Sequence, residues 1–265
     1  MTDIDPERAR RAIVEHTRRL AESAVAAGPD TVVPTAPEWT VTDLVAHVGQ
    51  TQHWVAEIIE RRVPDPTQLP TEMVAPPTEP AEWPAWLAES AQRAASAFSD
   101  EALDASVWNA AGDDRTGGQF WLHSQVNEAV VHGFDAAAAA GHDVEVDADI
   151  AAGLVTNHLK MLTSPTWEMQ RPESAHAMRG TGETLQWLAT DTPDDAGAWF
   201  VERRPDGATW QPGAQPADVT VSGPAGSLLA ILTRRRPLTD RGDLSVDGDV
   251  ALAQHWLDST AHVAD

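Results

Sequence analysis

The sequence contains no cysteine among its 265 residues. This absence excludes a disulfide framework, a cysteine nucleophile, thiolate zinc sites and iron–sulfur clusters. Any sulfur chemistry must therefore use a thiol that is not part of the chain, and metal ligands must be histidine, aspartate or glutamate. Lysine is almost absent as well: Lys160 is the only one, and it lies in an ordinary helical pattern, which argues against a lysine Schiff base.

Positive charge and long apolar runs are also scarce. The 18 basic and 41 acidic side chains give a formal net charge of −23, which argues against nucleic acid and anionic membranes as partners because both need a basic surface. No stretch approaches the ~20 apolar residues of a membrane span, and the charged N-terminal sequence lacks the apolar region of a signal peptide. We therefore expect a soluble, cytoplasmic protein. Its 42% of hydrophobic residues is enough for a packed core.

The first 165 residues carry helical patterns. Apolar residues recur at helical spacing over 5–27 and again from Trp39, where Thr40 followed three residues later by Asp43 predicts an N-terminal cap. Residues 34–37 are expected to form a loop, and the proline-rich stretch 64–80 a longer one that either covers a site or only connects two helices. Further helices are expected over 84–98, 118–141 and 147–162. Four of these helices are long enough to predict a four-helix bundle over residues 1–165.

The pattern changes after Pro172. Short segments of alternating polarity predict strands within 183–190, 198–204, 208–211, 218–223 and 244–249. The stretch 204–207, Arg-Pro-Asp-Gly, is typical of a hairpin turn. A short buried helix is expected over 226–233 and a closing helix over 249–263. We therefore expect a two-domain α+β protein whose second, smaller domain spans residues 170–265.

Glu128 and His132 lie four residues apart on the expected helix 118–141. At this spacing two side chains share one helix face, with Cβ atoms about 5–6 Å apart, so both could reach one divalent ion. A third ligand must come from another helix, and His47, on or beside the core-facing side of its helix, is the natural candidate. Two nitrogens and one oxygen leave a fourth position open, which is the pattern of a catalytic zinc site. An exposed Glu–His pair and a hydrogen-bonded core histidine are the alternatives.

Asp135 lies seven residues after Glu128 on the same helix face. It could be a ligand itself, an acceptor that holds His132, or an exposed charge near the helix end. Trp39, Trp54 and Trp121 could wall the pocket near the metal or pack in the core.

Two pieces of the helical half resemble a known family. The segments WTVTDLVAHVG (39–49) and NEAVVHGFDA (127–136), the latter followed by Gly141, are similar to the N-terminal domain of the mycothiol-dependent maleylpyruvate isomerase family, which belongs to the DinB-like metal-binding four-helix bundles. The segment ADVTVSGPAGSLLAILTRRRPL (217–238) resembles that family's smaller α+β domain, which has sterol-carrier-protein-like character. The order of a histidine, then E-x-x-x-H-x-x-D-A, with a tryptophan before the first histidine, carries more weight than any single match.

The resemblance implies a ligand set, a metal and a cosubstrate. The family's ligands fall on His47, Glu128 and His132, its metal is zinc, and its thiol is mycothiol. In the isomerase the thiol adds to a conjugated cis double bond of a small electrophilic substrate, the resulting single bond rotates, and the thiol leaves to give the trans isomer. In an S-transferase of the wider superfamily the thiol stays attached to the electrophile.

The sequence departs from the family pattern at two positions near the glutamate. Ser124 stands where an arginine is frequent, and Asn127 where a histidine is frequent. These departures leave open a non-catalytic metal-binding or small-molecule-binding protein of the same fold, and a hydrolase that uses zinc-bound water is a further alternative.

Arginines 234–236 form the densest positive run in this acidic chain. The resemblance matches Arg235 to an arginine of the family's second domain. We therefore take Arg235 as the candidate that pairs with a carboxylate of the substrate or thiol. A solvated helix C-terminus, where cations are favoured, is the alternative for the run.

Overall fold

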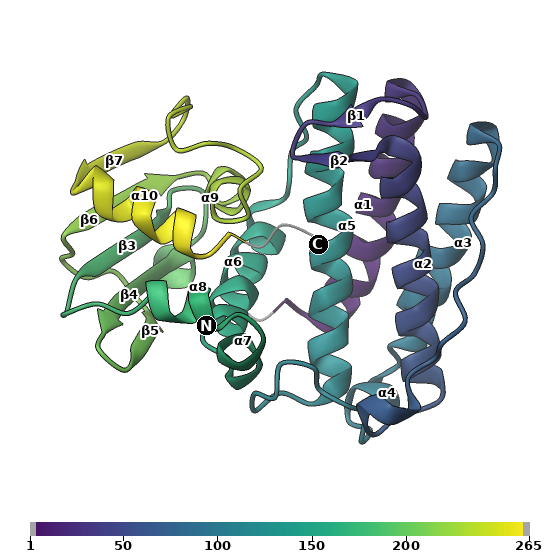
Figure 1. The fold of residues 1–265 in the computed structure, drawn as a ribbon, viewed down its shortest axis with the longest axis horizontal. Coiled ribbons are helices and arrows are strands. Elements are labelled where there is room, and N and C mark those ends of the chain that lie inside the picture. The colour runs from purple at the N-terminus through teal and green to yellow at the C-terminus, as the bar shows by residue number, and fades with distance from the viewer. Residues whose placement is uncertain (1–3, 262–265) are drawn as a thin grey trace. The chain divides into compact units, whose positions relative to one another are not determined.

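Four long helices build the first of the two units into which the chain divides, Asp5–Val144 (Figure 1). They are α1 (Pro6–Ala27), α2 (Val41–Glu60), α3 (Trp83–Ala97) and α5 (Gly117–Ala140). The computed structural model describes residues 4–261, and within that range no helix is long and apolar enough to cross a lipid bilayer.

Local capping explains where these helices begin and end. Thr40 and Asp43 form a reciprocal capping box at the start of α2, as the sequence predicted. Thr116 and Gln119 form a second capping box at the start of α5. Helix α5 ends at Gly141, whose φ of 75° is the left-handed conformation that glycine adopts without a steric cost.

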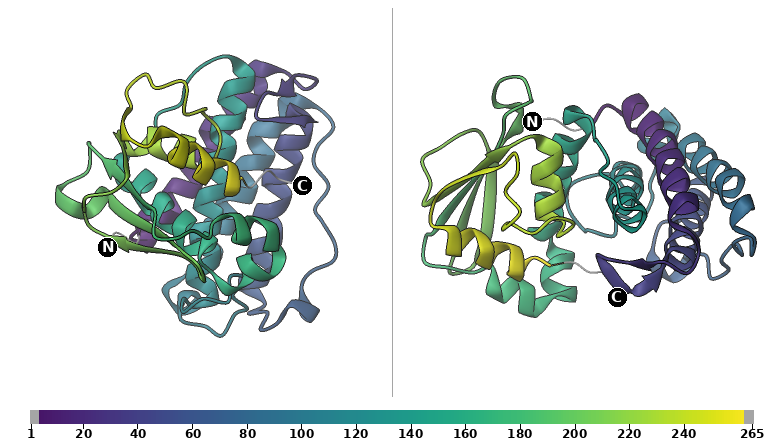
Figure 2. Two further views of the ribbon diagram at one scale, coloured as in Figure 1. Left: turned by 60° about the vertical axis from the view of Figure 1, so that its left-hand side comes forward. Right: turned by 90° about the horizontal axis from the view of Figure 1, so that it is seen from above.

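The four helices pack as a ring. Helix α1 contacts α3 and α5, and α2 contacts the same two helices; Figure 2 shows them from above in its right-hand view. Much of the core at one end of the bundle consists of small and branched apolar side chains, which allow the helices to approach closely. Its buried members include Leu20, Ala21, Ala24, Val41, Leu44, Val45, Val48, Trp83, Leu87 and Ala136.

The connections between the helices hold more structure than the sequence predicted. Residues 32–40, which include the expected loop 34–37, form an antiparallel hairpin of β1 (Val32–Val33) and β2 (Ala36–Thr40) beside α2 and α5 (Figure 1). The proline-rich segment between α2 and α3 contains only the short 3₁₀ turns η1 (Pro66–Gln68) and η2 (Pro80–Glu82). The indole nitrogen of Trp54 donates to the Pro70 carbonyl at 2.9 Å, which fixes this segment to α2. A short helix, α4 (Asp100–Leu103), precedes α5.

The second unit begins at Glu145 and is built on a five-stranded sheet. The strands are β3 (Thr184–Ala189), β4 (Ala198–Arg204), β5 (Gly207–Pro212), β6 (Val219–Gly223) and β7 (Ser245–Gly248), in the spatial order β5-β4-β3-β6-β7. Only the β3–β6 pair is parallel. The remaining elements are α6 (Ala148–Leu162), α7 (Pro165–Gln170), α8 (Pro172–Ala177), η3 (Asp194–Gly197), α9 (Ala225–Leu232) and α10 (Val250–Ser259).

Helix α6 belongs to the second unit, whereas the sequence analysis assigned its residues to the bundle. It packs against α9, and the indole nitrogen of Trp199 on β4 donates to Thr156 of α6 at 2.9 Å. The helical periodicity showed which face of this helix is apolar but not which layer covers it. The boundary therefore lies at residues 144–145 and not after 165.

Arg203 ties the sheet to α8. The residue is 9% exposed, and its guanidinium donates to the carbonyls of Ala177 and Arg179 at 3.1 and 2.6 Å. A third hydrogen bond reaches the carbonyl of Met178 at 3.3 Å.

The five predicted strands of this unit are present. The predicted turn at 204–207 is present as well, since Arg204 pairs with Gly207. Residues 262–263 of the predicted closing helix lie outside the described residues.

Candidate metal centre

His47 projects from α2 next to α5. The capping box of Thr40 and Asp43 fixes the first turn of α2 two turns before this histidine. Two contacts set the register of α2 against α5: His47 meets Glu128, and the rings of Trp54 and Trp121 lie 5.6 Å apart. Because Trp54 follows His47 by seven residues while Trp121 precedes Glu128 by seven, the two helices run antiparallel.

Glu128 and His132 complete a cluster from one face of α5. The Nε2 atom of His47 lies 3.1 Å from Oε2 of Glu128, and the Nε2 atom of His132 lies 3.2 Å from the same oxygen. The ligand atoms of the three residues all lie within 4.8 Å of one another. The structure thus brings together the three side chains that the sequence predicted to meet.

The cluster lies at the edge of the bundle core. The side chains of His47 and Glu128 are 33% and 23% exposed, whereas that of His132 is 8% exposed. Two imidazole nitrogens and a carboxylate oxygen, converging from the buried side with partial access to solvent, suit a divalent ion with an open coordination position. The donor set fits zinc, and it also suits other first-row divalent metals.

The charges within the cluster are strongly coupled. Burial by itself raises the pKa of Glu128, but hydrogen bonds from His132 and His47 outweigh it and hold that pKa well below its usual range. Burial by itself lowers the pKa of His132, but Asp135 and Glu128 raise it to about 9. Without a bound ion, a protonated His132 therefore supplies the positive charge that balances the Glu128 carboxylate.

Asp135 touches His132 on the side away from Glu128. Its Oδ2 atom lies 2.8 Å from Nδ1 of His132, and its side chain is only 1% exposed. The second carboxylate oxygen accepts a hydrogen bond from the Thr35 hydroxyl in the turn between β1 and β2. Of the three roles that the sequence left open for Asp135, the structure shows an acceptor that holds His132.

The hairpin also places an indole over the cluster. The ring of Trp39 on β2 lies 4.9 Å from that of His47 and 5.9 Å from that of His132. Trp39 therefore lies beside the candidate site. Trp54 and Trp121 contact each other farther along the helix pair, where Trp108 and Phe120 join them. These two tryptophans form an aromatic cluster two helical turns from the three candidate ligands.

Arg235 lies in the second unit, just after α9. Its guanidinium donates to the carbonyl of Thr233 at 2.8 Å and the residue is half-buried. The neighbouring arginines are held within the same unit, Arg234 by the carbonyl of Leu257 and Arg236 by Asp243. The structure thus shows local anchoring of the arginine run, and a substrate-binding role of Arg235 stays a prediction.

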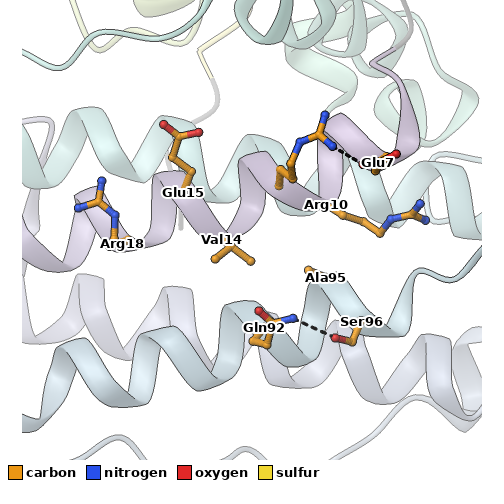
Figure 3. Close-up of a pocket in the computed structure, with 9 residues that line it drawn as sticks. Glu7, Arg10, Val14, Glu15, Arg18, Gln92, Ala95 and Ser96 are labelled. Atoms are coloured by element: carbon orange, nitrogen blue, oxygen red, sulfur yellow. Dashed lines mark hydrogen bonds and ion pairs between the residues drawn. The ribbon is translucent and has the colours of Figure 1, made fainter.

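A separate open groove of about 540 Å³ lies between α1 and α3 (Figure 3). Its lining carries several charges, but these form ion pairs along α1, such as Arg11 with Glu7. Arg10 is engaged by the carbonyl of Phe98 at 2.7 Å. A surface of mutually paired charges offers little to an incoming ligand, so we do not assign this groove a function.

Sequence reasoning missed Thr35 and the hairpin that carries it. Nothing in the spacing of the chain connects residue 35 with residue 135, because the contact joins elements 100 residues apart. Pro34 and Pro37 indicated a loop, because proline is rare inside strands. The short strands on either side of the turn were therefore not predicted.

Known families match both units. The family model described as "Mycothiol maleylpyruvate isomerase N-terminal domain" matches residues 10–137, and the model described as "MDMPI C-terminal domain" matches residues 149–255. No curated protein sequence matches the chain.

Two solved structures share the fold. One is a crystal structure of a mycothiol-dependent maleylpyruvate isomerase, with 17% identity, a TM-score of 0.59, and coverage of 94% of this chain and 98% of that one. The other is a histidine-to-alanine variant described by the same name, with the same identity and coverage and a TM-score of 0.58. At this identity the likeness shows the fold, and it confirms the predicted two-domain α+β class.

Proposed function

Because this chain belongs to the mycothiol maleylpyruvate isomerase family, we propose that it is a metal-dependent enzyme that uses the low-molecular-weight thiol mycothiol on a small electrophilic substrate. The observation that carries the proposal is the meeting of His47, Glu128 and His132 from two helices, with their ligand atoms within 4.8 Å. The absence of cysteine from the chain agrees with it, because the sulfur must then come from outside.

Each residue of the cluster has a distinct part in the proposal. His47 and His132 hold the ion through their Nε2 atoms, and Glu128 supplies a carboxylate oxygen and a negative charge. Trp39 covers the two imidazoles on one side and keeps bulk water from that side of the site. When bound, a divalent ion, for which zinc is our first choice, supplies the Lewis acidity that lowers the pKa of a thiol.

Arg235 is our candidate for a group that pairs with a carboxylate of the substrate or thiol. Its guanidinium is planar and always charged, and its fork of N–H groups matches the geometry of a carboxylate. Replacement by methionine is expected to raise KM for a carboxylate-bearing substrate while metal content stays unchanged. An unchanged KM removes Arg235 from the site.

Metal analysis of the purified protein is the first test. We expect about one divalent ion per chain, lost in the His47→Ala and His132→Ala variants. His142→Ala is the matched control, because His142 is an exposed histidine near the end of α5 that contacts Ser23 and lies outside the cluster. Absence of stoichiometric metal from the parent protein overturns the proposal.

Turnover with and without mycothiol then separates the possible activities. An isomerase regenerates the thiol, so product forms while mycothiol is not consumed. An S-transferase consumes one thiol for each adduct formed. Thiol-independent turnover indicates hydrolysis by metal-activated water. Stoichiometric metal without any turnover favours the non-catalytic binding protein that the departures at Ser124 and Asn127 suggested.

A further inference from the structure

We propose that Asp135 and Thr35 are positioning residues for the metal centre: together they fix the ring orientation and tautomer of His132, so that its Nε2 atom faces the ion held with His47 and Glu128. This inference rests on the proposed function, because it needs an ion at the cluster. It extends that function to the hairpin β1–β2, an element that supplies none of the three ligands.

The geometry of Asp135 is that of a fixed acceptor. It follows His132 by three residues on α5, its side chain is 1% exposed, and its Oδ2 atom lies 2.8 Å from Nδ1 of His132. A neutral imidazole has one N–H and one lone pair. An Nδ1–H that donates to Asp135 leaves the lone pair on Nε2, and Nε2 is the atom that faces Glu128. The contact therefore selects the tautomer that can bind a cation.

Thr35 keeps that acceptor in place. Its hydroxyl donates to Oδ1, the oxygen of Asp135 that does not face His132. With both oxygens engaged, the carboxylate is restrained from rotating away from the imidazole. A hydroxyl at this position is the simplest such anchor, because it supplies a directed donor without adding a charge to the buried group.

The hairpin reaches the centre at a second point. Trp39, four residues after Thr35, places its ring 4.9 Å from His47 and 5.9 Å from His132. The hairpin thus touches one histidine from each helix and the carboxylate behind His132. Its packing, and not the two helices alone, determines how the two imidazoles are presented.

The test measures metal affinity directly. Zinc is titrated against a chromophoric chelator for the parent protein and for Asp135→Ala, Asp135→Asn and Thr35→Val. We expect Asp135→Ala to weaken zinc binding about 10–100-fold. Asp135→Asn is expected to weaken it less, because an amide oxygen still accepts from Nδ1–H but carries no charge. Thr35→Val, which keeps the side-chain volume, is expected to weaken binding about 2–10-fold, within the range of one lost hydrogen bond, and Thr35→Ser to restore it.

Two further readouts separate positioning from a general contribution to folding. The visible absorption of the cobalt-loaded protein reports the ligand geometry, and we expect its bands to shift in Asp135→Ala and Thr35→Val. Thermal unfolding of the metal-free proteins reports stability alone. Asp143→Asn, an exposed carboxylate beyond the end of α5, and Thr42→Val, a hydroxyl that donates to a backbone carbonyl, are the matched controls and are expected to leave zinc affinity unchanged.

The outcomes distinguish this inference from the proposed function. A parent protein that binds neither zinc nor cobalt overturns both. A parent that binds zinc, with variants that bind it within twofold and keep the cobalt spectrum, overturns only the positioning role, even when their melting temperatures fall. If Asp135→Ala does not fold, the isosteric variants Asp135→Asn and Thr35→Val decide the question.

Discussion

Two glycines in the bundle helices should respond in opposite directions to the same substitution. A Cβ atom built on Gly49 of α2 would lie 2.2 Å from a ring atom of Trp86 on α3, with two more ring atoms within 2.9 Å. A Cβ atom on Gly133 of α5 would meet nothing within 4 Å. Both residues lie inside long helices, so alanine removes the same backbone entropy cost at each position.

The magnitudes follow from two opposing effects. Alanine in place of glycine stabilises a helix interior by about 0.5–1 kcal/mol. Overpacking a rigid ring costs about 1–3 kcal/mol, and the approach of three ring atoms at Gly49 places its cost in the upper part of that range. We therefore expect Gly49→Ala to lower the free energy of unfolding by about 1–2 kcal/mol and Gly133→Ala to raise it by about 0.5–1 kcal/mol.

Urea denaturation followed by far-UV circular dichroism measures both changes. Trp86→Leu provides the internal check, since it removes the ring that the new methyl group meets. In that background Gly49→Ala should lose most of its penalty, which gives a favourable coupling energy in a double-mutant cycle. Equal stability of Gly49→Ala and Gly133→Ala, or an unchanged penalty of Gly49→Ala in the Trp86→Leu background, would contradict these expectations.

Four further predictions concern polar groups. Gln125 is fully buried and neither of its amide atoms has a hydrogen-bond partner among the described residues, so Gln125→Leu should raise the urea-unfolding free energy by about 1 kcal/mol; a decrease would reveal a bound water or ligand. Arg203→Met should lower the stability of the second unit by about 2–3 kcal/mol in thermal unfolding, because three carbonyls lose their donor, while Arg204→Met, an exposed control, should change it by less than about 0.5 kcal/mol. Thr40→Ala should lower the free energy of unfolding by about 1 kcal/mol, because it removes the N-terminal cap of α2. Hydrogen bonds from Thr40 lower the pKa of Asp43, so the stabilisation from this carboxylate is present above the ordinary aspartate pKa and is lost as pH falls through the lowered folded-state value; equal acid sensitivity of the parent protein and Asp43→Asn would contradict this.

The helices and the meeting of His47, Glu128 and His132 were predictable because their determinants are local. The capping box at Thr40 and the glycine at 141 are encoded within a few residues of the helix ends that they set. The spacing of Glu128 and His132 fixes a shared face on any helix. His47 needed one further step, namely that an imidazole near the core-facing side of a second helix could reach that face.

The features that sequence reasoning missed depend on contacts between distant segments. Thr35 meets Asp135 only because the hairpin folds back over the bundle, and strands of two and five residues give almost no periodic signal. Whether α6 belongs to the first or the second unit depends on which layer its apolar face packs against. Trp199, which donates a hydrogen bond to Thr156 of α6, lies 43 residues farther along the chain. A run of arginines predicts positive charge but not the carbonyls and carboxylates that engage it.

The parallel pairing of β3 with β6 constrains the order in which the sheet can assemble. Strands β3, β4 and β5 follow one another as antiparallel neighbours, so contacts close in sequence can form them early. The other edge of β3 stays open until β6 arrives, since Leu185 pairs with Val219, 34 residues later. Closing such a long loop is slow compared with hairpin formation. We therefore expect β3 to be paired along only one edge during synthesis, until the β6 segment has been made and joins it.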